Sequence, residues 1–192
     1  MNKISLLIVA LFVLGSCSKS LSKKEIEQYT GKGKEIAQAT AKKLGGNLVK
    51  KMKAGGTEKA IPFCNTKADP LTKEMSKKYN VDIKRTSHKL RNEINSPNKE
   101  ETKIINRYKS LFDEGKPLKP IVELDKSGKP HFYAPIKLQK KCLTCHGSLT
   151  EDINVKTDSI IKSYYPKDLA VGFKEGDLRG IWSITFKSEV KH

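Results

Sequence analysis

The chain contains 192 residues, and its 38 lysines and arginines against 21 aspartates and glutamates give a formal net charge of +17. Less a short leader, this is one domain of ordinary size, long enough to bury a core without structural disulfides. The lysines are spread along the whole chain and form no compact basic stripe with aromatic residues, so we expect no nucleic-acid binding. The positive charge has two possible explanations: contact of the protein with an anionic membrane surface, or a solvated surface whose charge only aids solubility.

The N-terminus has the pattern of a bacterial secretory signal. An apolar run at residues 4–14 is too short to span a bilayer and ends in small residues. Leu14-Gly15-Ser16-Cys17 is similar to a lipoprotein cleavage box, so we expect residues 1–16 to be a signal peptide and Cys17 to be acylated. The alternative is an ordinary signal peptide with an incidental cysteine.

The segment that follows predicts where the protein resides. Residues 17–22 would form a lipidated tether, and residues 18–22 reach no more than about 15–20 Å when fully extended. We therefore expect the domain, residues 23–192, to lie against the periplasmic side of a bacterial membrane. Ser18 stands where an inner-membrane retention signal usually has aspartate, which favours the outer membrane.

Helical patterns dominate the first part of the domain. Apolar residues at helical spacing predict a long amphipathic helix from residue 23 to 53, which Gly45-Gly46 allows to bend. Ala54-Gly55-Gly56 ends this helix, and Thr57 can cap a second one. Asp69-Pro70 has the pattern of a further helix start, and that helix runs to about residue 79.

The rest of the chain combines strand and helix patterns. We expect, in order, a strand at 81–90, a loop at 92–98, a helix at 99–114, strands at 118–124 and 130–136 joined by a hairpin turn at 125–128, a short helix at 142–147, a polar loop, and a strand at 181–186. Helices in front of an antiparallel sheet predict the α+β class.

Cys142-Leu143-Thr144-Cys145-His146 is the C-x-x-C-H pattern of c-type haem attachment. The spacing lets one turn of backbone present both thiols to the two porphyrin vinyl groups, and His146 then supplies an axial imidazole. A redox dithiol or half a zinc site is the alternative, but the sequence has neither a second Cys/His pair nor a βαβ pattern. The export signal supports one covalent haem c, since thioether attachment occurs outside the cytoplasm.

Cys64 is the remaining cysteine once Cys17 is assigned to lipid and Cys142 and Cys145 to haem. An odd thiol in an exported protein suggests a reactive group, an intermolecular pair or a metal ligand. A small buried hydrophobe is the alternative, because free cysteine is often buried.

Four segments of the chain follow one another in a recognisable order. They are Ala60-Ile61-Pro62-Phe63-Cys64 with Ala68; Arg85-Thr86-Ser87 with Leu90-Arg91-Asn92, Asn95 and Pro97; Cys142 to Gly147; and Tyr165-Pro166-Lys167-Asp168-Leu169-Ala170 with Gly172 and Gly176-Asp177-Leu178-Arg179-Gly180. Together they resemble the PAS-like c-type haem domain family, exported single-haem proteins and sensor regions of signalling proteins. The resemblance covers essentially the whole mature chain, although Glu93 replaces the family's usual proline.

This resemblance implies a PAS-like antiparallel sheet with helices around a single haem. It also implies that Cys64 is the second axial ligand, opposite His146. The other side chains able to ligate iron are Met52, Met75, His88 and His131, of which His88 is the strongest rival because it adjoins a matched segment; His192 is at the chain terminus.

Three arginines stand at matched positions in a chain whose basic residues are mostly lysines. Arg85, Arg91 and Arg179 are candidates to bind the haem propionates, because a planar guanidinium pairs with a carboxylate through two hydrogen bonds. The alternative for each is a solvated strand residue.

These features leave three functional classes. The first is a redox or small-ligand sensor, in which a Cys/His-ligated haem passes its state to a partner protein. The second is a one-electron carrier in a periplasmic chain. The third, a haem enzyme, needs an open coordination position and a distal acid–base group, and the sequence nominates neither. We therefore expect no enzymatic activity.

Overall fold

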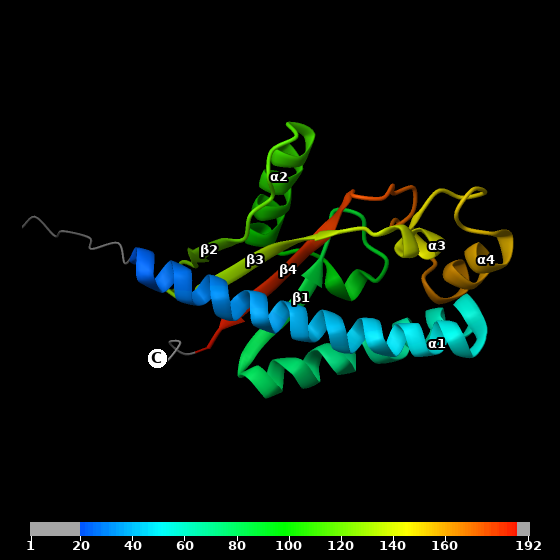
Figure 1. Cartoon of the computed structure of the whole chain (residues 1–192), viewed down its shortest axis with the longest axis horizontal. Coiled ribbons are helices and arrows are strands. Elements are labelled where there is room, and N and C mark those ends of the chain that lie inside the picture. The colour runs from blue at the N-terminus through cyan, green and yellow to red at the C-terminus, as the bar shows by residue number, and fades with distance from the viewer. Residues whose placement is uncertain (1–19, 188–192) are drawn as a thin grey trace, which may run out of the picture.

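A computed structural model describes residues 20–187, so the predicted signal peptide, Cys17 and His192 lie outside the described residues. The elements are α1 (Lys23–Tyr79), β1 (Val81–Thr86), η1 (Glu93–Asn95), α2 (Lys99–Asp113), β2 (Ile121–Leu124), β3 (Pro130–Lys137), η2 (Lys140–Cys142), α3 (Leu143–His146), α4 (Val155–Tyr164) and β4 (Leu178–Phe186). A four-stranded antiparallel sheet with helices around it confirms the predicted α+β class (Figure 1). No helix within residues 20–187 is long and apolar enough to cross a bilayer.

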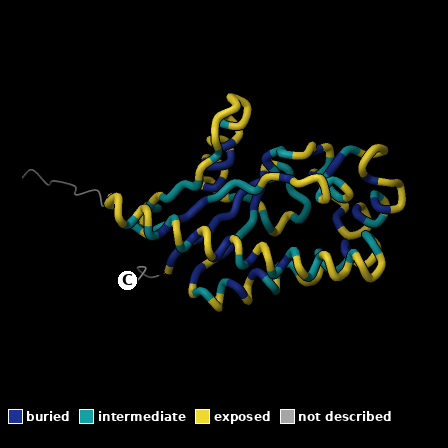
Figure 2. The backbone as a smooth tube through the Cα atoms, viewed as in Figure 1, coloured by how far each residue is buried: buried dark blue, intermediate teal, exposed yellow. Residues whose placement is uncertain are grey.

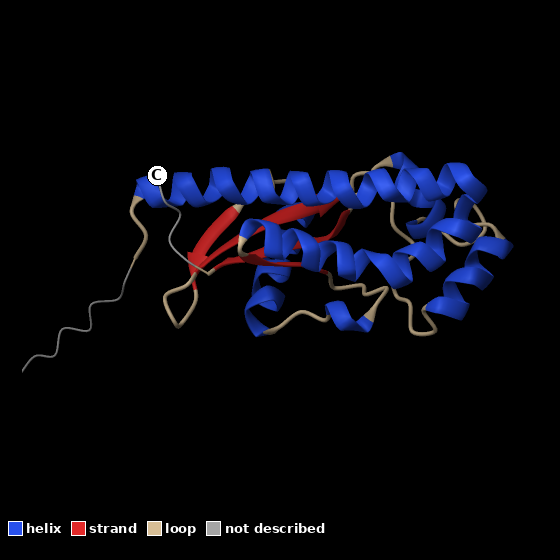
Figure 3. Cartoon of the chain, turned by 90° about the horizontal axis from the view of Figure 1, so that it is seen from below, coloured by secondary structure: helices blue, strands red, loops and turns tan. Residues whose placement is uncertain are grey.

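Helix α1 consists of two arms that fold back on each other (Figure 3). Ser22 and Glu25 form a capping box at its start. The first arm ends at the predicted place, where Gly56 takes a φ of 61° and the chain reverses. The second arm, residues 57–79, returns to Asn80, which adopts the left-handed conformation and leads into β1.

The predicted helix start at Asp69-Pro70 is wrong. The second arm runs through Pro62 and Pro70 without non-helical dihedral angles, and the first arm runs unbroken through Gly45-Gly46. Each proline removes one backbone hydrogen bond, but the apolar side of the arm, with Met75 buried against the sheet, keeps the segment helical.

The sheet has the strand order β1-β4-β3-β2, with β4 in its interior. Both arms of α1 pack on one face, in a core cluster that includes Ile36, Met75, Phe132 and Ile184. Helix α2 covers the other face with a second cluster: Ile104, Ile105 and Tyr108 against Tyr133, Leu178 and Ile181. Burial is therefore concentrated in the strands and in the sides of the helices that face them (Figure 2).

One end of the molecule, beyond the sheet, contains the C-x-x-C-H segment. Strand β3 leads into η2 and α3, and α4 then lies beside the α1 kink, far from residue 20 (Figure 1). The predicted polar loop after the motif is wrong, because Asn154 caps α4 by accepting a hydrogen bond from the Thr157 amide at 2.8 Å. The first strand also stops at Thr86, four residues earlier than predicted, where Ser87 turns the chain through a side-chain bond to the Lys89 amide.

Candidate functional site

The C-x-x-C-H segment forms a single compact turn. Cys142 closes η2, and α3 carries Cys145 and His146 one turn later. Cys142 and Cys145 are partly buried free thiols, as is Cys64. The structure therefore presents two unpaired thiols from one turn with an imidazole next to them.

A backbone carbonyl fixes the His146 ring. Its Nδ1–H donates to the Ala170 carbonyl oxygen at 2.8 Å, and the ring meets Phe173 edge-on at 6.5 Å between centroids. Burial, together with the positive charges of Arg91 and Arg179, lowers the pKa of His146 from 6.5 to about 3. The imidazole is therefore neutral, with its proton on Nδ1 and the lone pair of Nε2 available to a metal.

Residues 170–173 form a strap along the motif. The Gly172 amide donates to the Gly147 carbonyl at 2.7 Å, and the Phe173 amide donates to the His146 carbonyl at 3.0 Å. Gly172 has a φ of 73°, which a residue with a side chain rarely adopts. These bonds fix the backbone of the motif as well as its imidazole.

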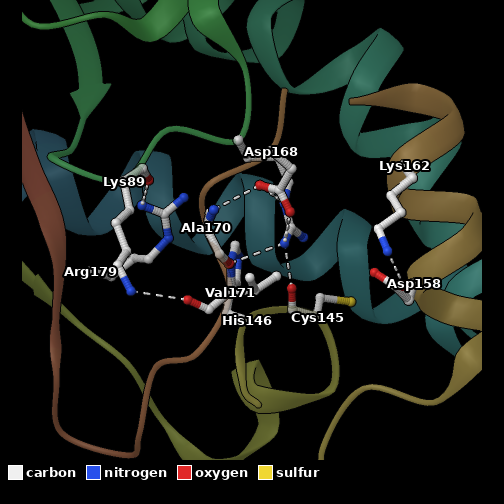
Figure 4. Close-up of polar contacts among 10 residues, drawn as sticks. Lys89, Cys145, His146, Asp158, Lys162, Asp168, Ala170, Val171 and Arg179 are labelled. Atoms are coloured by element: carbon white, nitrogen blue, oxygen red, sulfur yellow. Dashed lines mark hydrogen bonds and ion pairs between the residues drawn. The ribbon is translucent and has the colours of Figure 1, made fainter. Parts of the chain in front are cut away.

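Arg91 joins the strap to the motif. Its Nε and Nη2 donate to the two carboxylate oxygens of Asp168 at 3.2 and 3.0 Å, and Nη2 also donates to the carbonyls of Cys145 (2.5 Å) and Ala170 (3.1 Å). The Asp168 side chain is only 5% exposed. Figure 4 shows Asp168, Ala170, His146 and Cys145 converging at this point.

Arg179, the second predicted arginine, contacts Lys89 and Phe173. Its Nη1 donates to the Lys89 carbonyl at 2.9 Å, and its guanidinium lies 5.4 Å from the Phe173 ring centroid. The Lys89 ammonium is 4.9 Å from the same ring. Burial and the nearby charge of Arg91 lower the pKa of Arg179 to about 10.

Cys64 lies in the second arm of α1, three residues after Ile61, whose buried cluster packs against Cys145. Burial raises the pKa of its thiol, the neighbouring Cys145 raises it further, and Arg85 and Arg91 oppose the rise. Arg85 stacks on Trp182 at 5.8 Å, and burial lowers its pKa against the opposing effect of Cys64. Arg91, which donates to the Cys145 carbonyl, and Arg85 therefore both act on the Cys64 thiol through their charges.

The other side chains that could ligate iron in place of Cys64 lie in different parts of the molecule. His131 hydrogen-bonds Asp125 and Thr185, both at 3.0 Å, at the other end of β3 from the motif, and Met75 lies within the sheet core. His88 is exposed and meets the Phe173 ring edge-on at 6.1 Å. His88 and His146 therefore contact the same Phe173 ring.

Sequence reasoning missed the residues that position the motif. Asp168 and Ala170 stand in a matched segment but received no role. Asp168 could have been singled out from the sequence because it is an acidic residue in a strongly basic chain. No sequence signal marks a carbonyl such as that of Ala170, because every residue has one.

The donor set fits a c-type haem. Porphyrin supplies four iron ligands, so the protein has to provide only one or two, such as the His146 Nε2 and the Cys64 sulfur. No group of three or more His, Cys, Asp or Glu side chains in residues 20–187 could hold a metal ion by itself. Arg85 and Arg179 remain predicted propionate partners, as does Arg91, although Arg91 already binds Asp168.

Comparisons with known proteins agree with this fold. The sequence model of a family described as Tll0287-like matches residues 19–187. The crystal structure of the cyanobacterial haem protein Tll0287 superposes with a TM-score of 0.60 at 22% sequence identity, covering 89% of this chain and 100% of that chain. No curated protein matches the chain.

Proposed function

The chain belongs to the Tll0287-like family, and from this premise we propose that it is a membrane-anchored c-type cytochrome domain with one covalent haem. The similar solved structure is that of a haem protein. The observation that carries the proposal is the combination of two free thiols on one turn with an imidazole whose Nδ1–H is bound to the Ala170 carbonyl. When bound, haem supplies one-electron redox chemistry and an axial position for a ligand.

The motif residues have distinct roles in this proposal. Cys142 and Cys145 would each hold the haem through a thioether, in which the thiol S–H has added across one vinyl group. His146 would bind iron through Nε2 while the Ala170 carbonyl holds its ring, and Arg91 keeps Cys145 and the strap in register. Arg85 and Arg179 are available for the propionates.

Cys64 is the proposed second axial ligand, and it distinguishes a sensor from a simple carrier. A thiolate opposite imidazole favours ferric iron, which predicts a low reduction potential. Burial raises the pKa of the Cys64 thiol, so a released sulfur would take up a proton and not return at once. Loss of Cys64 on reduction would open a position for a small ligand, which is the kind of two-state behaviour that a redox or gas sensor needs.

The remaining parts of the proposal concern location and partners. Acylated Cys17 would anchor the domain on the periplasmic side of a bacterial membrane, with the outer membrane favoured. A redox or signalling protein would respond to the redox or ligand state of the haem. No enzymatic activity is proposed, because Cys64 would occupy the sixth coordination position of the iron. A one-electron carrier in a periplasmic chain is the second candidate.

The test is periplasmic expression with cytochrome c maturation proteins, followed by a pyridine haemochrome assay. We expect one haem per chain with two thioether bonds, and no covalent haem in Cys142→Ala/Cys145→Ala. Absence of covalent haem from the wild-type protein would refute the proposal. Redox-dependent loss of the Cys64 ligand would favour the sensor, whereas rapid electron self-exchange with unchanged ligation would favour the carrier.

A further inference from the structure

A shallow groove lies where the α1 kink meets the C-terminal end of α4. It encloses about 500 Å³, and its lining includes Lys51, Lys59 and Lys67 together with Phe63 and Tyr164. No acidic side chain is part of this lining. We call this surface the lysine groove.

The positive charge of the lysine groove is not neutralised locally. None of its three lysines forms an ion pair with any residue in the described range 20–187. Glu58, the acidic residue beside Lys59 in the chain, is already paired with Lys156 at 2.5 Å. The Lys51 ammonium instead lies 5.9 Å from the Phe63 ring centroid.

The lysine groove is the outer side of a helix contact whose inner side belongs to the candidate site. Phe63 precedes Cys64 in α1, and Tyr164 precedes Tyr165. Tyr165 lies in a buried cluster with Ile61, and Cys145 of the motif packs against that cluster. Asn65 ties the two helices together by donating to the Tyr164 carbonyl at 3.2 Å.

We propose that the lysine groove is the docking surface for a small acidic electron-transfer protein. This inference rests on the proposed function. One electron would pass from the partner's reduced flavin to the ferric iron, with no bond made and no proton moved. Uncompensated lysines would attract the partner's carboxylates, and exposed Tyr164 beside half-buried Phe63 would supply the apolar centre of the contact.

The position and shape of the lysine groove favour a protein over a lipid or a small molecule. From Lys23 to Lys51 the chain is one continuous helix, about 42 Å long at 1.5 Å per residue. Residue 20 and the α1 kink therefore lie at opposite ends of the molecule (Figure 1). A tether at the N-terminus would leave the groove turned towards soluble partners, and Tyr164, 42% exposed, stands open to them.

The test measures the affinity of a fluorescently labelled flavodoxin, a strongly acidic carrier, by anisotropy at low ionic strength. The groove variant is Lys51→Glu/Lys59→Glu/Lys67→Glu. The matched control is Lys24→Glu/Lys34→Glu/Lys126→Glu, which makes the same change in net charge at exposed lysines near the N-terminus and the β2–β3 hairpin. We expect the groove variant to weaken binding at least tenfold and the control to change it by less than threefold.

Other outcomes overturn the proposal. Equal weakening in both variants would show diffuse attraction to a basic protein, and no measurable binding to the wild type would remove the docking site. Weaker binding to vesicles of 30% phosphatidylglycerol in the groove variant, with flavodoxin affinity unchanged, would assign the groove to lipid. The haem-free Cys142→Ala/Cys145→Ala protein is titrated in parallel, so failure of haem attachment and failure of docking are observed separately.

Discussion

The sheet half and the site end of this molecule are held together in different ways. The sheet half comprises the first arm of α1, residues 69–79 of its second arm, α2 and the strands, and its principal core cluster contains eleven buried residues. The site end comprises residues 57–68 and 138–176. It has two small clusters, one of Ile61, Ile153, Ile161 and Tyr165 and one of Leu138, Ala170 and Phe173. What the site end lacks in apolar burial is supplied by hydrogen bonds that converge on Arg91 and the strap.

This difference means that the most stable part of the molecule and the candidate site lie in different regions. The large apolar core makes the sheet half unfold cooperatively. A region held mainly by hydrogen bonds, such as those of Arg91 and the strap, can open locally while the sheet half stays folded. We therefore expect the site end of the haem-free protein to open at a lower free energy than the sheet half. Covalent haem would add a large apolar surface to the weaker region.

Replacing Arg91 should give the largest effect. Arg91→Met leaves the buried Asp168 carboxylate without its cation and should lower the free energy of unfolding by about 3–5 kcal/mol. Urea titration measures the loss, and hydrogen exchange should place it in residues 140–175. The control is Arg107→Met, whose pair with Glu123 is 58% and 48% exposed and contributes less than about 1 kcal/mol. Equal losses of unfolding free energy in the two variants would contradict the special role given to the buried Arg91–Asp168 pair.

Acid should weaken the haem-free site end through His146. Its folded pKa of about 3 lies below the unfolded value of 6.5, so the unfolded chain binds the extra proton between these values. This contribution to the free energy of unfolding is fully present above pH 6.5 and is lost as the pH decreases towards 3, by about 4 kcal/mol. Urea titrations of Cys142→Ala/Cys145→Ala with and without His146→Gln isolate this contribution. Parallel pH curves for the two proteins would contradict it.

A glycine in the sheet half tests the large core. A methyl group on Gly33 would overlap the Phe132 ring, which is fully buried, so Gly33→Ala should cost about 2 kcal/mol. Gly46→Ala in the same arm meets nothing within 4 Å and should stabilise the helix by about 0.5–1 kcal/mol. Thermal unfolding of both variants provides the check. A neutral Gly33→Ala would mean that the core is more plastic than described.

The smallest effect is expected at Thr86, where the two regions meet. Its buried hydroxyl has no hydrogen-bond partner among the described residues. Removing that desolvated group in Thr86→Val should raise the free energy of unfolding by about 1 kcal/mol, with Ser87→Ala, which loses a bond to the Arg179 carbonyl, as the opposite control. Destabilisation by Thr86→Val would show that the hydroxyl has a partner.

The same division explains how much of the molecule the sequence could predict. The sheet half follows from local patterns: apolar spacing predicted the first arm, Gly56 its end, and the Asp125-to-Gly128 turn the hairpin. In the site end, the polar segment before Tyr164 was taken for a loop. In the second arm of α1, Pro70 was taken for a helix start. Both mistakes arose because tertiary packing decides those segments.

The candidate site divides in a similar way. Cys142, Cys145 and His146 could be selected because their chemistry depends on spacing within one turn. The Arg91–Asp168 pair joins residues 77 positions apart, and the Ala170 carbonyl is a backbone group, so neither contact has a local pattern. Cys64 could be named from the sequence, but only the fold brings its helix, through Ile61, against Cys145.

The central claim is that Cys64 and His146 are the two axial ligands of one covalent haem. The most direct test is EPR spectroscopy with potentiometry on the purified wild-type protein and on Cys64→Ser. We predict a low-spin ferric spectrum with thiolate-type g values in the wild type. In Cys64→Ser those g values should disappear and the reduction potential should rise. An identical spectrum and potential in the two proteins would contradict the account, because Cys64 would then be only a packed side chain.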